Sequence, residues 1–178
     1  MRPEFLVAAT LVALPLLSCD RTTACTCYRE EAGTIENRCM EAAICDGPIS
    51  VTCLNYDTCF EANGELTVDS TERLECALAA IRDGEDGTFA ITSAGAESSL
   101  EMTFELYGDE LVRYSVTHLD LGGGISDVER APRPEAAAID ACAAADTPED
   151  RLRCLVDALE GTPVDKVCVA GSTFDAGL

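Results

Sequence analysis

The sequence contains no tryptophan, only one histidine (His118) and only one lysine (Lys166). Basic residues are scarce altogether, because 12 Lys and Arg stand against 33 Asp and Glu and leave a formal net charge of −21. A surface this acidic repels phosphate backbones, so we expect no nucleic-acid partner. The absence of a CxxC pair and of a second histidine disfavours a zinc site and excludes a thioredoxin-like redox motif.

Long apolar runs are also missing. The longest, "FLVAATLVALPLL" from Phe5, has 13 residues and is too short to span a bilayer. It follows Arg2 and the amino terminus, which is the arrangement of a secretory signal, a positive region ahead of an apolar one. We therefore predict a signal peptide over residues 1–18 and export from the cytoplasm.

The signal ends in "LLSC" (residues 16–19), with an aliphatic residue three positions before the cysteine and a small one directly before it. This stretch resembles the lipobox of bacterial lipoproteins. The resemblance implies that Cys19 takes a diacylglyceryl group, that the peptide before it is removed, and that the new amine is acylated. Several acyl chains on one residue give a firm anchor in a lipid bilayer. The alternative is ordinary signal cleavage after Ala24, with Cys19 discarded.

The chain holds eleven cysteines, and ten remain when Cys19 is set aside. An even number in an exported chain predicts structural disulfides, because the extracytoplasmic compartment is oxidising. A metal cluster and a reactive thiol are the weaker alternatives, and we expect no metal site and no cofactor. The candidates for disulfide bonds are Cys25, Cys27, Cys39, Cys45, Cys53, Cys59, Cys76, Cys142, Cys154 and Cys168.

The spacing of these cysteines suggests two folded units after the signal peptide. Six of the ten lie within residues 25–59, in a stretch with few apolar residues for a core. Such a stretch depends on covalent cross-links to fold. We therefore predict a cysteine-rich module over residues 19–66 and an α+β domain over residues 67–178.

Pairing within the six-cysteine group stays open, although Cys25 and Cys27 are too close to bond each other comfortably. Each is expected to reach another cysteine of the module. The four later cysteines are expected to pair among themselves. Cys142 with Cys154 is the preferred bond, because it would clamp a helical hairpin.

Helical and strand patterns alternate through the first half of the chain. "TIENRCMEAAICDG" (residues 34–47) predicts a short helix that ends at Gly47, and "SVTCLN" (residues 50–55) predicts a strand. "VDSTERLECALAAIRDG" (residues 68–84) predicts a longer helix, capped by Asp69 with Glu72 and stopped by Gly84. Its apolar stripe consists of Leu74, Ala77, Leu78 and Ile81.

Residues 88–121 switch to a period of two, which predicts antiparallel strands. "LEMTFEL" and "VRYSVTH" are the central pair, and residues 88–92 and 125–130 are expected to flank them. One register places only apolar side chains opposite one another on one face. It requires a loop with an odd number of residues, and it rejects a two-residue turn at Gly108 and Asp109. Its apolar pairs are Leu106 with Val112, Phe104 with Tyr114, and Met102 with Val116.

The segment over residues 132–161 predicts two helices. Pro134 starts the first, and Thr147 with Asp150 caps the second, whose stripe is Leu152, Leu155, Val156 and Leu159. The predicted fold is therefore α+β: a disulfide-rich N-terminal module followed by a helix, an antiparallel β-meander and a C-terminal helical hairpin.

Few residues suggest chemistry. In the register above, His118 lies opposite Leu100 on the apolar face, and the chain has no GxSxG motif to supply a nucleophile. Carboxylates at Asp83, Glu85 and Asp86 suggest calcium, but the twelfth position of an EF-hand loop would fall on an alanine. We assign no catalytic residue.

The sequence therefore predicts a lipoprotein of the bacterial cell envelope, held on the periplasmic side or the cell surface. It resembles cysteine-rich bacterial lipoproteins in type, and that likeness supplies no activity. We expect a non-catalytic binding or envelope module, with an unidentified protein or small molecule as ligand. The alternative is a small secreted hydrolase in which His118 acts as base or acid.

Overall fold

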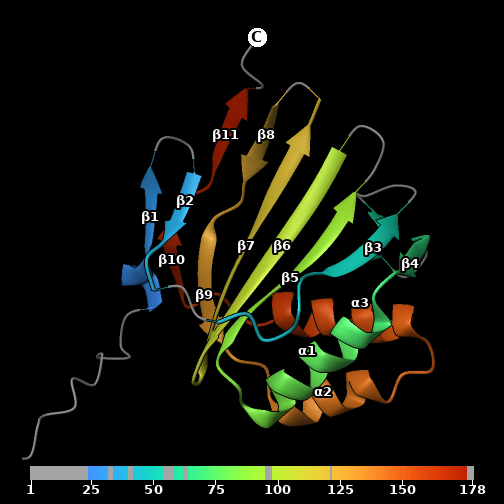
Figure 1. Cartoon of the computed structure of the whole chain (residues 1–178). Coiled ribbons are helices and arrows are strands. Elements are labelled where there is room, and N and C mark those ends of the chain that lie inside the picture. Colours follow the sequence, from blue (N-terminus) through green and yellow to red (C-terminus); the bar gives the residue numbers. More distant parts are fainter. Residues whose placement is uncertain are drawn as a thin grey trace, which may run out of the picture.

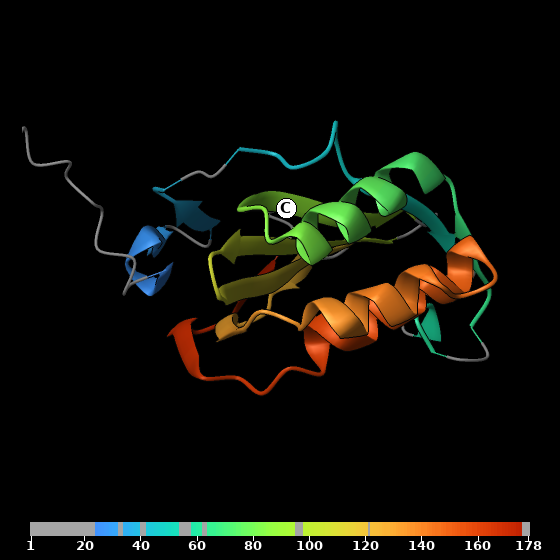
Figure 2. The same cartoon turned by 90° about the horizontal axis from the view of Figure 1, so that it is seen from below.

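A nine-stranded mixed sheet carries three helices on one face and a short two-stranded hairpin on the other (Figures 1 and 2). The computed structural model describes residues 24–31, 34–39, 42–53, 58–61, 64–94, 98–120 and 122–175. The predicted signal peptide and Cys19 lie outside these residues. The mixture of helices and strands confirms the α+β class.

The first part of the chain is mostly extended. The elements are η1 (Ala24–Cys27), β1 (Tyr28–Glu31), β2 (Thr34–Asn37), β3 (Ile49–Cys53), β4 (Leu66–Val68), α1 (Thr71–Asp83) and β5 (Gly87–Ala94). The second part contains β6 (Ser98–Tyr107), β7 (Glu110–Leu119), β8 (Gly122–Ile125), β9 (Val128–Pro132), α2 (Ala136–Ala143), α3 (Pro148–Glu160), β10 (Lys166–Val169) and β11 (Ser172–Asp175).

The strands follow the order β10-β9-β7-β6-β5-β3-β4, with β8 beside β7 and β11 beside β8. Strands β5, β6 and β7 form the predicted antiparallel meander. Strand β3 joins them in parallel to β5, which the sequence did not indicate. Residues 49–53, expected in a separate module, therefore belong to the main sheet, where they pair with β4 at its edge.

The apolar stripe of α1 is buried as predicted and consists of Leu74, Ala77, Leu78 and Ile81. Gly84 ends it in the left-handed region, at φ +77°. The predicted cap is wrong, because Ser70 holds the N-cap position and makes no side-chain cap bond. Asp69 instead accepts a hydrogen bond from the hydroxyl of Thr52, at 2.9 Å.

The predicted helical hairpin is confirmed in α2 and α3. Thr147 caps α3 by accepting a hydrogen bond from the backbone N–H of Asp150, at 3.1 Å. The stripe of α3 is buried, and Cys142 bonds Cys154 across the two helices. This hairpin and α1 cover the same face of the sheet (Figure 2).

The predicted register between β6 and β7 is wrong. A two-residue turn at Gly108 and Asp109 pairs Leu106 with Leu111 and Phe104 with Arg113. The prediction assumed a single buried face. In the structure the helices cover one face and the β1–β2 hairpin covers the other, so apolar side chains are buried on both.

Each face of the sheet has its own core. The larger core packs β3–β7 against the helices, with Phe104, Leu106 and Leu111 fully buried. The smaller core packs the hairpin and η1 against β7 and β9, and its central members are Ala24, Cys27, Tyr28, Val112 and Val128. The side chain of Val112, which the sequence placed opposite Leu106, is buried beneath the hairpin.

The helix predicted over residues 34–47 is also wrong. Thr34–Asn37 forms strand β2, which pairs with β1. Further on, the backbone N–H of Ile44 donates to the carbonyl of Thr88, at 2.9 Å, so this stretch runs beside β5. Tertiary pairing with neighbouring strands has overridden a helical pattern that carries only a weak propensity.

Five disulfides join all ten candidate cysteines, which confirms the disulfide prediction. The predicted grouping is wrong for two bonds, because Cys76 bonds Cys45 and Cys168 bonds Cys25. The remaining bonds stay within their groups: Cys27–Cys39, Cys53–Cys59 and Cys142–Cys154. The two crossing bonds reach from the N-terminal stretch to α1 and β10, and they tie it to the rest of the fold.

Candidate functional site

A polar groove lies on the helix-side face of the sheet, between β7–β9, the end of α3 and the start of β11. Figure 1 shows that β7 and β8 extend past the helices. The groove consists of two adjoining hollows of about 270 and 680 Å³ that share Ser115, Ser126 and Asp127. We call it the β7–β8 groove. The smaller hollow is also lined by Met102, Phe104, Arg113, Tyr114, Glu129 and Glu160. The larger one is also lined by Thr117, Gly124, Ile125, Gly171, Ser172 and Thr173.

An irregularity in the sheet shapes this groove. Ile125 and Val128 are both buried on the hairpin side although they are three positions apart, and strict alternation would place them on opposite faces. The extra residue is absorbed at Ser126 and Asp127, in the manner of a β-bulge. The prediction of one strand over residues 125–130 is therefore wrong, since β8 ends and β9 begins at this point.

Side chains at the bulge satisfy the interrupted backbone. Ser126 Oγ accepts from the N–H of Ser115 at 2.8 Å, and Asp127 Oδ1 accepts from the N–H of Gly171 at 2.6 Å. Gly171 lies at the matching break between β10 and β11. The hydroxyl and carboxylate are thus fixed in place, and fixed polar groups on a rigid sheet are suited to recognise a ligand.

Arg113 forms the inner wall of the groove. Its guanidinium lies 2.9 Å from a carboxylate oxygen of Glu129 and also donates to the carbonyl of Leu159 and, at 3.3 Å, to the hydroxyl of Thr162. The side chain is only 11% exposed. It therefore joins β7 to the end of α3 through its Nε and one terminal nitrogen.

The groove is acidic despite this arginine. Asp127, Glu129 and Glu160 contribute three carboxylates against one guanidinium. Burial, and then the carboxylates of Asp157 and Glu129, raise the pKa of Glu160, while Arg113 partly offsets this. An anionic ligand would meet like charge here, whereas a neutral or cationic one would not.

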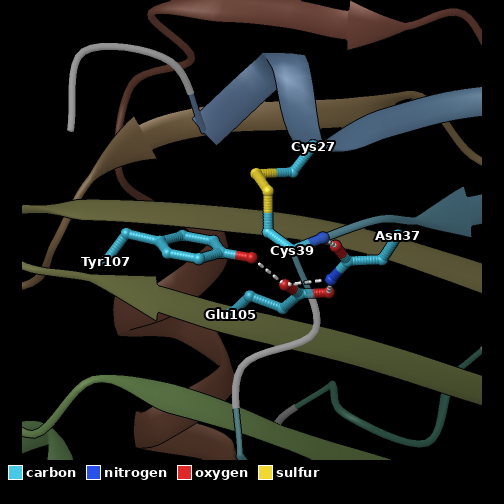
Figure 3. The surroundings of a disulfide bond; sticks show 5 residues. All are labelled: Cys27, Asn37, Cys39, Glu105 and Tyr107. Carbon is cyan, nitrogen blue, oxygen red and sulfur yellow. Dashed lines mark hydrogen bonds between the residues drawn. A yellow bond between two sulfur atoms is a disulfide. The ribbon is translucent and has the colours of Figure 1, made fainter. Parts of the chain in front are cut away.

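A second polar cluster is buried beneath the hairpin, on the opposite face (Figure 3). The carboxylate of Glu105, only 2% exposed, accepts from the side-chain amide of Asn37 at 2.6 and 2.7 Å and from the hydroxyl of Tyr107. Asn37 in turn accepts from the backbone N–H of Cys39, at 2.9 Å. The disulfide from Cys39 to Cys27 closes the hairpin over this carboxylate.

The tyrosines around Glu105 respond to its charge. Burial, and then the Glu105 carboxylate, raise the pKa of Tyr28 far above its usual range. Burial and the hydrogen bond to Glu105 likewise raise the pKa of Tyr107. Because the cluster is enclosed between hairpin and sheet, we assign it the role of holding the hairpin rather than of contacting a ligand.

His118 does not occupy the predicted position. It pairs with Ser99 and Gly123, not with Leu100, and its side chain is exposed on the hairpin side of the sheet. Its ring lies 5.7 Å from the ring of Phe174, between centroids. The position is thus not the packed one predicted from the register, and His118 lines neither hollow of the β7–β8 groove.

The carboxylates after α1 are engaged locally. Asp83 pairs with Arg82, and a hydrogen bond from that guanidinium lowers the pKa of Asp83. Asp86 accepts from the backbone N–H of Gly108, at 2.5 Å. In the described part of the chain, no group of three or more His, Cys, Asp or Glu side chains is arranged to hold a metal ion.

Sequence reasoning missed the groove, Arg113 and Glu105. The available signal was the spacing of Ile125 and Val128 around two polar residues, which indicates a bulge.

No protein-family model, no curated protein and no solved structure matches this chain. No helix within the described ranges has both the length and the apolar character needed to cross a membrane.

Proposed function

We propose that this protein is a bacterial envelope lipoprotein, anchored through acylated Cys19, whose folded part binds a small polar molecule in the β7–β8 groove. The observation that carries the binding role is the groove itself, in which Ser126 and Asp127 are fixed at a bulge beside a mostly acidic wall. Bulges are over-represented next to functional sites because they redirect side chains out of the regular pleat.

The location rests on the cysteines. Five disulfides indicate an extracytoplasmic protein, because thiols in the cytosol are kept reduced. The anchor rests on the resemblance of residues 16–19 to a lipobox. An acyl anchor would be needed for stable membrane attachment, since a chain of charge −21 gains nothing from anionic headgroups as a whole.

The chemistry of the groove favours a neutral, hydroxyl-rich ligand or a cationic amine. Serine and threonine hydroxyls line its outer part, and carboxylates line its inner part. Met102 and Phe104 add an apolar wall at the inner end. Hydroxyl and ammonium groups both donate hydrogen bonds to these acceptors.

Substitution of the anchor cysteine tests the location. Wild-type protein should enter the detergent phase on phase partitioning, and Cys19→Ser should stay in the aqueous phase or remain unprocessed. Equal partitioning of the two proteins would refute the lipoprotein assignment. It would leave the binding role to be judged by a separate measurement.

Amide chemical shifts measured with spermidine, glucose and citrate test the binding role. We expect spermidine or glucose to move the resonances of Ser115, Ser126 and Gly171, and citrate to leave them unchanged. Glu160→Gln should weaken spermidine binding several-fold, because it removes an acceptor charge. Glu72→Gln, an exposed substitution in the first turn of α1, is the matched control. Unmoved groove resonances with both spermidine and glucose would refute the proposal.

The hydrolase alternative requires His118 to act on a substrate. Screening the purified domain against ester, peptide and glycoside substrates, with His118→Ala as comparison, tests it directly. Turnover that is lost in the variant would replace the binding role with a catalytic one. The exposed position of His118 beside Phe174 gives no support to that outcome.

A further inference from the structure

We infer that the sheet edge at β10 rests on the bilayer surface, with Val164, Val167 and Lys166 in the headgroup region. The inference deepens the proposed function, because it depends on the anchor at Cys19. It assigns an interaction surface to a part of the fold that lies outside the β7–β8 groove.

The tether between anchor and fold is short. Only residues 20–24 separate Cys19 from Cys25, and six fully extended residues reach at most about 20 Å. Cys25 is held by its disulfide to Cys168, with the two Cα atoms 4.8 Å apart. The anchor therefore keeps β10 near the membrane, whatever path the tether takes.

Exposed apolar side chains concentrate beside this fixed point. Among the described residues, the large hydrophobic side chains that remain exposed are Leu119, Val164 and Val167, at 50%, 42% and 44%. Two of these three lie within four positions of Cys168. Single exposed valines are common on protein surfaces and need no explanation. Two exposed valines close to a lipid anchor, however, can contact the bilayer in which the anchor is inserted.

The charges around Lys166 are compatible with a headgroup layer. Lys166, the only lysine of the chain, is exposed between the two valines. The neighbouring Asp165 and Glu110 are both paired with Arg130. A lysine keeps its ammonium among headgroups while its carbon chain follows apolar surface. Arg130 and Lys166 therefore balance Glu110 and Asp165, so these four groups carry no net charge. The nearest acids beyond them are the exposed Asp109, beside Val164, and Glu129, which pairs with Val167.

The opposite end of the sheet provides an internal comparison. Leu119 is the last residue of β7 and lies six positions after Arg113. Arg113 pairs with Glu129 of β9, and Glu129 pairs in turn with Val167 of β10. At about 3.3 Å per residue this places Leu119 roughly 20 Å from the β10 position along the strand. Figure 1 shows β10 near β1 and η1, away from the tip of β7. A docked β10 edge would hold Leu119 in water.

The absence of tryptophan makes the test clean. The variants Val167→Trp and Leu119→Trp are prepared as acylated mature proteins that begin at Cys19. They are reconstituted in vesicles of phosphatidylethanolamine and phosphatidylglycerol with brominated acyl chains. We expect the emission of Val167→Trp to be blue-shifted and quenched several-fold more strongly than that of Leu119→Trp. The emission of Leu119→Trp should be unquenched and resemble that of tryptophan in water. Equal emission from the two variants, or stronger quenching of Leu119→Trp, would overturn the docking.

A measurement on the unmodified chain guards against a variant that fails to fold. Amide hydrogen exchange over residues 164–169 should slow on vesicles relative to detergent-free protein cleaved from its anchor, with residues 116–119 unchanged. Vesicle flotation separates the two proposals. Protein that does not float overturns the anchor and the docking together, whereas protein that floats with an unquenched, freely exchanging β10 overturns the docking alone.

Discussion

The side-chain amide of Asn37 donates to both carboxylate oxygens of Glu105, at 2.6 and 2.7 Å, from a strand 68 positions earlier in the chain. This contact joins the β1–β2 hairpin to the centre of the sheet. A buried carboxylate without hydrogen bonds is strongly unfavourable, so the hairpin and Glu105 stabilise each other. Removal of either partner takes these hydrogen bonds from the other group.

Glu105→Ala should destabilise the fold by about 3 kcal/mol, because Asn37 and Tyr107 lose a charged acceptor in a buried place. Glu101→Ala is the matched control, since Glu101 lies on the same strand and face but is exposed. We expect the control to change the free energy of unfolding by at most about 0.5 kcal/mol. Urea denaturation followed by circular dichroism measures both. Equal effects would show that Glu105 does not hold the hairpin.

High pH should unfold the protein as its buried tyrosines ionise. Burial is the main cause that raises the pKa values of Tyr28, Tyr107 and Tyr114 in the fold, while an unfolded tyrosine ionises near pH 10. The stability from these groups is fully present below pH about 10 and is lost as pH rises through the folded-state values. We expect tyrosinate absorbance to rise together with loss of the circular dichroism signal. A smooth titration of all tyrosines near pH 10 with the fold intact would contradict this.

Glu160→Gln should stabilise the protein at neutral pH. The pKa of Glu160 is raised in the fold, mainly by burial, so its favourable contribution is present in acid and is lost as pH rises through the folded-state value. The gain should be no more than about 0.5 kcal/mol, because Glu160 is only partly covered and water screens its charge. It should disappear below the ordinary pKa of glutamate, near pH 4. Thermal unfolding from acid to neutral pH decides, with Glu72→Gln expected to show no such trend.

Loss of the Cys25–Cys168 disulfide should cost more than loss of Cys142–Cys154. The first closes a loop of 143 positions and the second a loop of 12, so chain entropy predicts a difference of about 2 kcal/mol. Paired Cys→Ala substitutions and urea denaturation measure it. An equal cost for the two double variants would show that native contacts, not loop closure, set the contribution.

Local patterns predicted the helices well and strand pairing poorly. The stripes of α1 and α3 and the Thr147 cap depend on residues close in sequence, so period and capping rules were enough. The register of β6 and β7 depends on which faces are covered. Val112 and Tyr114 looked like partners of the helix-side core, and only the distant hairpin explains why they belong to the other face.

The candidate site was beyond prediction for a related reason. Arg113 faces the helix side, opposite Phe104, because its guanidinium reaches the end of α3 and Glu129, contacts that join segments far apart in the chain. Gly122 to Gly124 looked like a break but form strand β8. Gly123 has no room for a side chain, since an added Cβ would lie 2.7 Å from the ring of Phe174. Such close approach of a later strand leaves no local signal.

The bond between Cys25 and Cys168 also bears on how the protein matures. A chain exported N-terminus first presents Cys25 to the oxidising machinery while its partner, 143 positions later, is still in the cytoplasm. During that interval the nearest thiols are Cys27 and then Cys39, which belong to each other in the native fold. An oxidase acting in order of emergence would therefore trap non-native bonds. Native pairing in the oxidising compartment would then require those bonds to exchange before the late partner Cys168 can take its place.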